Sequence, residues 1–159
     1  MSIEHIQLDV QPVISKVIQN WEVRISESVN SAMHYARWQR FPNETGGVLV
    51  GTIDIQHKVV QVADLIPSPP DSVEWPTMYI RGSENLRDQI EQKFILSGGD
   101  LRYVGEWHTH PQGHSNEPSR QDLEAHQYLV EQMAADGLPG VVLIKGENHE
   151  PYVLLDWKP

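Results

Sequence analysis

The chain has 159 residues, which suits a single domain, and its 39% hydrophobic and 21% charged residues are typical of a globular protein. The formal net charge is −10, and a surface this acidic argues against nucleic acids and anionic membranes as partners. There is no cysteine, so any metal must be bound by nitrogen and oxygen ligands. We expect no signal peptide, because no basic region precedes an apolar stretch, and we therefore expect a cytoplasmic location.

The first part of the chain is predicted to be an extension followed by a strand and a helix. Residues 1–20 form an N-terminal extension in which apolar side chains recur at helical spacing, and residues 21–159 form one domain. Alternation predicts a strand over 21–25. Ser26 is a plausible N-cap for a helix that continues to about Trp38.

The middle of the chain is predicted to form a hairpin and a loop. The β-branched and apolar residues of 45–55 and 59–66 predict two paired strands, the first of them buried on both faces. The proline-rich segment 67–76 predicts an ordered loop within the domain, because β-like sequence resumes near Tyr79.

The remaining sequence alternates between helical and strand-like patterns. It predicts a helix from Ser83 to about Leu96, a strand over 101–110, a helix from Ser119 to about Ala135, and closing strands over 141–145 and 152–157. Since helices and hairpins are mixed along the chain, we predict an α+β fold with a mixed central β-sheet flanked by helices.

A possible metal site lies at the end of the strand over 101–110. Side chains alternate along a strand, so His108 and His110 face the same side, about 7 Å apart. Pro111 ends the strand. Asp122 lies in the first turn of the next helix and supplies a third ligand. Two histidines and one carboxylate leave a fourth position open for water, as catalytic zinc requires.

Each part of this pattern also has a structural explanation. A His-x-His pair in a strand is more often structural or solvated than ligating, and Ser119 with Asp122 is typical of a helix cap. Other candidates remain open, because Glu106 shares the strand face of the histidines and His126 lies one helical turn from Asp122. Spacing alone does not choose the general base among the three candidates Glu44, Glu106 and Glu117, and His114 lies in the connecting loop.

The combination of these residues resembles the JAMM, or MPN-plus, metalloprotease signature. That signature has an upstream glutamate, two histidines one residue apart, a serine and an aspartate, which are matched here by Glu44, His108, His110, Ser119 and Asp122. The resemblance extends over about 25–157. It implies an MPN or cytidine-deaminase-like fold and enzymatic activity as a zinc-dependent metallopeptidase.

The resemblance also assigns roles to individual residues. It implies that His108, His110 and Asp122 bind one zinc ion per chain. It implies that Glu44 is the general base that takes a proton from the attacking water and passes it to the leaving amine. It implies that Ser119 donates a hydrogen bond to the tetrahedral oxyanion.

Three segments are similar to a narrower group of bacterial JAMM peptidases, those encoded beside E1/E2-like proteins in CBASS antiphage operons: ETGGVLVG at 44–51, VEWPTMYIRG at 73–82 and GEWHTHP at 105–111. This similarity implies removal of a cGAS/DncV-like nucleotidyltransferase from its targets, by cleavage of the amide at its C-terminal residue. One alternative is the processing of a ubiquitin-like or sulfur-carrier protein in an E1/E2-like pathway. A non-enzymatic MPN scaffold is a second, which the intact signature argues against.

Such an enzyme must receive an extended C-terminal tail of its protein substrate. We expect the segment 67–82 to form one wall of the tail's groove, where Trp75, Met78 and Tyr79 supply apolar contacts and the tail pairs with a sheet edge. In the alternative, Trp75 and Tyr79 pack as a small core beneath a long loop.

Overall fold

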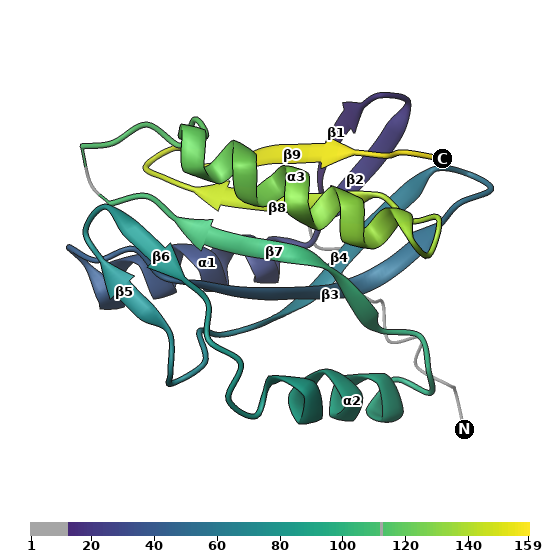
Figure 1. Cartoon of the computed structure of the whole chain (residues 1–159), viewed down its shortest axis with the longest axis horizontal. Coiled ribbons are helices and arrows are strands. Elements are labelled where there is room, and N and C mark those ends of the chain that lie inside the picture. The colour runs from purple at the N-terminus through teal and green to yellow at the C-terminus, as the bar shows by residue number, and fades with distance from the viewer. Residues whose placement is uncertain (1–12, 112) are drawn as a thin grey trace, which may run out of the picture.

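A seven-stranded mixed β-sheet forms the centre of the computed structural model, which describes residues 13–111 and 113–159 (Figure 1). The strand order is β1-β2-β4-β3-β7-β8-β9, with β2–β4 and β7–β8 parallel and the other neighbours antiparallel. The strands are β1 (Ile14–Ile18), β2 (Trp21–Ile25), β3 (Gly46–Asp54), β4 (Val59–Ile66), β7 (Arg102–Thr109), β8 (Gly140–Lys145) and β9 (Tyr152–Asp156). A separate hairpin consists of β5 (Val73–Trp75) and β6 (Met78–Ile80). The predicted mixed sheet is confirmed.

Three helices cover the two faces of the sheet (Figure 1). They are α1 (Glu27–Arg40), α2 (Leu86–Leu96) and α3 (Arg120–Ala134). Met33 of α1 packs in the main hydrophobic cluster with Trp107 and Leu143 of the sheet. The neighbouring sheet residues point the other way and pack against α2 and α3 in two smaller clusters. None of the described helices is long and apolar enough to cross a membrane.

The two central strands, β3 and β7, position the part of the fold that matters for function. β3 is buried on both faces over its first six residues, as its run of apolar residues predicts. It pairs antiparallel with β7, so that Gly46 lies opposite His108. The pairing continues past the strand ends, where the Thr109 N–H donates to the Thr45 carbonyl at 2.8 Å and the Thr45 N–H to Thr109 Oγ1 at 3.0 Å.

The structure differs from the sequence prediction in three local details, one of which is that strand β5 lies within the segment 67–76, which the sequence predicts to be a loop. The apolar residues at helical spacing near the start of the described chain form strand β1, paired with β2; residues 1–12 of the predicted extension lie outside the described residues. The helix predicted from Ser83 begins at Leu86. The N–H groups of Ser83 and Glu84 instead donate to the Asp71 carboxylate at 3.0 Å, which holds residues 83–85 in a turn.

Close packing between β3 and its neighbours predicts that Gly47→Ala destabilises the fold. A Cβ at Gly47 would lie 2.0 Å from the Ile66 carbonyl oxygen and 2.8 Å from Trp107 Nε1, which itself bonds to that carbonyl. We expect the free energy of unfolding to fall by about 1–3 kcal/mol, as for other overpacked cores. Urea denaturation measures the loss, with Thr52→Ala on the same strand as the control. An equal loss in both variants would contradict the argument.

Candidate metal centre

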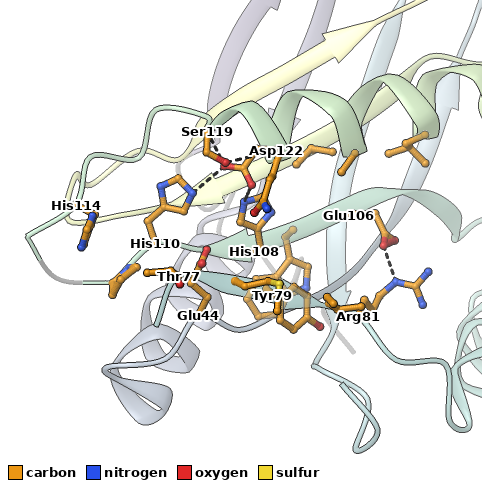
Figure 2. Close-up of a pocket in the computed structure, with 18 of the residues that line it drawn as sticks. Glu44, Thr77, Tyr79, Arg81, Glu106, His108, His110, His114, Ser119 and Asp122 are labelled. Carbon is orange, nitrogen blue, oxygen red and sulfur yellow. Dashed lines mark hydrogen bonds and ion pairs between the residues drawn. The ribbon is translucent and has the colours of Figure 1, made fainter. Parts of the chain in front are cut away.

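His108 of β7 and His110, one residue past the end of that strand, converge on the face of the sheet that α3 covers (Figure 2). Their ring centroids lie 5.5 Å apart. The His110 N–H donates to the Lys145 carbonyl at 2.9 Å, and ring atom Nδ1 lies 2.6 Å from the Ser115 carbonyl oxygen. Because a carbonyl oxygen only accepts, Nδ1 carries a proton and donates it. The other nitrogen, Nε2, is thereby the atom available to a metal.

Asp122 reaches both histidines from the first turn of α3. Its Oδ1 lies 3.0 Å from His108 Nε2 and its Oδ2 lies 3.0 Å from His110 Nε2. The carboxylate is held in place by the predicted cap, which the structure confirms: the Ser119 N–H donates to Asp122 Oδ2 at 2.8 Å, and the Asp122 N–H donates to Ser119 Oγ at 3.1 Å. A capped first turn therefore orients this carboxylate rigidly.

Glu44 reaches the same place from the residues that lead into β3 (Figure 2). Its N–H donates to the Trp75 carbonyl at 2.9 Å, which ties it to the β5–β6 hairpin. One carboxylate oxygen of Glu44 and a ring nitrogen from each of His108 and His110 all lie within 4.8 Å of one another. Burial raises the pKa of the Glu44 carboxyl above its ordinary value, although the nearby histidines oppose this.

The chemistry of these groups fits a bound cation. His108 Nε2 is buried and has no hydrogen-bond partner among the described residues, because its approach to Asp122 has the distance but not the alignment of a hydrogen bond. Buried polar atoms without a partner are rare in folded proteins. Two neutral imidazole nitrogens and a carboxylate are all acceptors, so only protons or a cation can hold them together, and this donor set suits zinc.

The charges on these groups show how strongly they interact. Burial alone would raise the pKa of Asp122, but the hydrogen bond to His110 and the close approach of His108 together outweigh it and hold that pKa well below its usual range. Burial opposes charging of His110, but the bonds to Asp122 and to the Ser115 carbonyl, together with the negative charges of Asp122 and Glu44, outweigh it and raise the pKa of His110. The site therefore favours an ionised aspartate next to positive charge, which either protonated imidazoles or a metal ion supplies.

The structure also places the other candidates. Glu106 shares the face of the histidines, as alternation predicts, but Arg81 Nε donates to its Oε1 at 2.5 Å and the Tyr103 hydroxyl to its Oε2 at 2.8 Å (Figure 2). His126 is buried, with Nε2 3.0 Å from the Gly140 carbonyl oxygen. Arg81 was not predicted from the sequence. The one indication of such a residue was that a half-buried acid on a strand, Glu106, needs a cationic partner.

A cavity of about 580 Å³ joins these groups. The catalytic candidates line it, and so do Arg81, Glu106 and Gln132; Figure 2 shows Arg81 and Glu106 on the other side of His108 from Ser119. His114 and Glu117 are exposed residues of its rim. Tyr79 is among the lining residues. Its hydroxyl group is hydrogen-bonded to that of Ser68, at 3.1 Å. Trp75 is 59% exposed and does not line the cavity.

Comparison with known proteins identifies the family. Residues 26–158 match the family of prokaryotic homologs of the JAB domain. A CD-NTase/cGAS isopeptidase of Enterobacter hormaechei is 33% identical over 104 residues, which are 65% of this chain and 56% of that relative, so the match spans little more than half of the relative's length. A CD-NTase/cGAS isopeptidase of Escherichia coli is 30% identical over 129 residues, covering 81% of this chain and 78% of the relative.

One solved structure shows the same fold. The solution structure of protein DSY2949 from Desulfitobacterium hafniense superposes with a TM-score of 0.50 at 20% identity, covering 84% of this chain and 88% of that one. These comparisons confirm the predicted fold and the predicted relationship to the JAMM family, and the two relatives named above are isopeptidases. The chain belongs to the family of prokaryotic homologs of the JAB domain, whose JAMM signature its histidines, aspartate, serine and upstream glutamate resemble.

Proposed function

We propose that this chain is a zinc-dependent isopeptidase that cleaves the amide bond joining the C-terminal tail of one protein to another protein. The convergence of His108, His110 and Asp122 next to Glu44 carries the proposal. We propose further that the tail belongs to a cGAS/DncV-like nucleotidyltransferase of CBASS defence, as the names of the relatives suggest. The enzyme would act in the cytoplasm and would reverse the reaction of an E1/E2-like protein that forms the conjugates.

Glu44 has the properties of a general base in this reaction. When bound by His108, His110 and Asp122, Zn²⁺ would lower the pKa of a water molecule to about 7 and polarise the substrate carbonyl. Glu44 is 7% exposed, and its carboxylate lies close to one ring nitrogen of His108 and one of His110. Its raised pKa suits a carboxylate that must accept a proton from water and then release it to the leaving amine.

Ser119 can stabilise the negative charge that develops on the carbonyl oxygen. Its Oγ accepts the Asp122 N–H at 3.1 Å, which fixes the side chain at the helix terminus. The hydroxyl hydrogen has no acceptor among the described residues, and Ser119 lines the cavity. A fixed hydroxyl next to the metal-binding groups therefore supplies a hydrogen-bond donor for an oxyanion.

The rest of the cavity has the dimensions of an extended peptide. One face of α3 lines it from Asp122 through Ala125 and Leu129 to Gln132, a length of about 15 Å at 1.5 Å per residue. An extended chain rises about 3.3 Å per residue, so the groove accommodates about four residues of a tail. Strand β6 borders the groove, and a tail could pair with the edge of this hairpin by β-augmentation.

A cleavage assay tests the function directly. The chain is incubated with a reporter joined by an amide bond to a nucleotidyltransferase tail, and separately with a diglycine-tailed sulfur-carrier fusion. We expect cleavage after the last residue of the nucleotidyltransferase tail, its loss with a chelator and its return with Zn²⁺, all read from product masses. Preference for the sulfur-carrier fusion would support the alternative substrate class. Cleavage of neither, or cleavage insensitive to chelator, would contradict the proposal.

Glu44→Gln separates the role of base from that of ligand. The amide cannot take up a proton, so we expect the cleavage rate to fall by about 10²–10⁴-fold, while zinc content stays near one per chain. Metal analysis and the cleavage assay together measure this. Near-normal turnover would contradict the base assignment, and loss of zinc would show that Glu44 is a ligand.

Asp122→Asn tests the third ligand. The amide can still accept the Ser119 N–H, so the helix cap survives, but the neutral oxygen binds a cation weakly. Loss of a group that only supports a metal ligand typically lowers metal affinity about 10–100-fold, and we expect loss of the ligand itself to lower zinc affinity at least as much. Competition with a chromogenic chelator measures the affinity. Glu124→Gln, on the exposed side of α3, is the matched control. Unchanged affinity in Asp122→Asn would remove this residue from the ligand set.

Glu106→Gln tests the last open candidate. Because both carboxylate oxygens already accept hydrogen bonds from Arg81 and Tyr103, we expect the variant to keep its zinc and most of its activity. The same metal analysis and cleavage assay apply. Loss of the metal would make Glu106 a ligand instead.

A further inference from the structure

A buried arginine reaches the candidate metal site from the opposite face of the sheet. Arg37 lies on α1 and is 7% exposed, and its Nε donates to the carbonyl oxygen of His110 at 2.7 Å. The two residues are 73 positions apart in the sequence. The contact therefore links the helix on one face to a candidate ligand on the other.

Burial of this guanidinium is costly and only partly compensated. Its Nη2 has no hydrogen-bond partner among the described residues. The acidic side chain that pairs with it is that of Glu147, whose Oε1 lies 4.0 Å from Nη2. Buried charges are normally paired closely with an opposite charge, and an apolar side chain of similar size often stabilises a fold as well. General stability therefore does not explain an arginine at this position, whereas the bond to His110 does.

The carbonyl of His110 needs a partner from outside the sheet. The next residue is Pro111, which ends the strand, and β7 itself stops at Thr109. The His110 N–H is fixed by Lys145 of β8, and ring atom Nδ1 by Ser115. Arg37 supplies the third constraint, so that the backbone on both sides of the His110 Cα is held by hydrogen bonds, as is the ring.

A second contact extends this restraint along the loop. Glu147 Oε1, close to Arg37, accepts the Gly113 N–H at 2.6 Å. Arg37 and Glu147 thus hold the chain at His110 and again at Gly113. Pro111, His114 and Ser115 from this turn line the cavity.

We propose that Arg37, supported by Glu147, is a positioning residue that holds His110 in its metal-binding orientation. The inference rests on the proposed metal site and adds a residue that lies outside the JAMM signature. Arg37 does not touch substrate or metal; it acts through the backbone of His110. Groups that orient a metal ligand from outside the coordination sphere typically account for 10–100-fold in metal affinity.

Zinc affinity of the folded protein is the readout, because a purely structural residue would alter stability and leave affinity unchanged. Zn²⁺ is titrated in competition with a chromogenic chelator, and metal-free thermal midpoints are measured in parallel. We expect Arg37→Gln to weaken zinc binding by about 10–100-fold. Arg37→Lys should recover most of the affinity, because an ammonium group can donate to the same carbonyl. Arg87→Gln, an exposed arginine on α2, is the control and should bind zinc as the wild type does.

Glu147→Ala keeps the test decisive if Arg37→Gln does not fold. Glu147 has a side chain 51% exposed, so its removal should leave the fold intact while freeing Gly113, and zinc affinity should still fall. Wild-type affinity in folded Arg37→Gln overturns the inference. If that variant does not fold, wild-type affinity in Glu147→Ala overturns it. A wild-type protein that binds no zinc would contradict the proposed function itself, which is a distinguishable result.

Discussion

The antiparallel register between β3 and β7 is the constraint on which the site depends. It places Gly46 opposite His108, and the continued pairing of Thr45 with Thr109 brings Glu44 next to histidines distant in the sequence. Glycine at position 46 permits this approach, since a Cβ there would lie 2.3 Å from the Trp107 carbonyl oxygen. A slip of one residue would turn His108 toward α1. The apolar core that fixes this register therefore also assembles the candidate metal-binding groups.

The groups that converge there all attract positive charge, which gives the site its chemical character. Asp122 is held between two imidazoles by a helix cap, and Glu44 is buried next to them. Four elements contribute: β7, the first turn of α3, the segment before β3 and, through Arg37, α1. The groove beyond the site is continuous with it, so that a tail lying along α3 would present its last amide bond to Glu44 and Ser119.

Much of the fold and part of the site could be predicted from local sequence. Alternation correctly put His108 and Glu106 on one face, and the spacing of Ser119 and Asp122 predicted the cap, because both patterns depend on neighbouring residues. Partners far apart in sequence could not be predicted in this way. The bond from Arg37 to His110 and the pairing of Arg81 with Glu106 depend on how whole elements pack. Glu44 was singled out only by family resemblance, since its position is fixed by strand register.

Zinc K-edge X-ray absorption of the zinc-loaded protein distinguishes whether two histidines and a carboxylate bind one metal ion, as we propose. We expect two imidazole nitrogens at about 2.0–2.1 Å from the zinc, with oxygen atoms completing the coordination. A spectrum that requires no imidazole, or three or more, would contradict the ligand set of His108, His110 and Asp122.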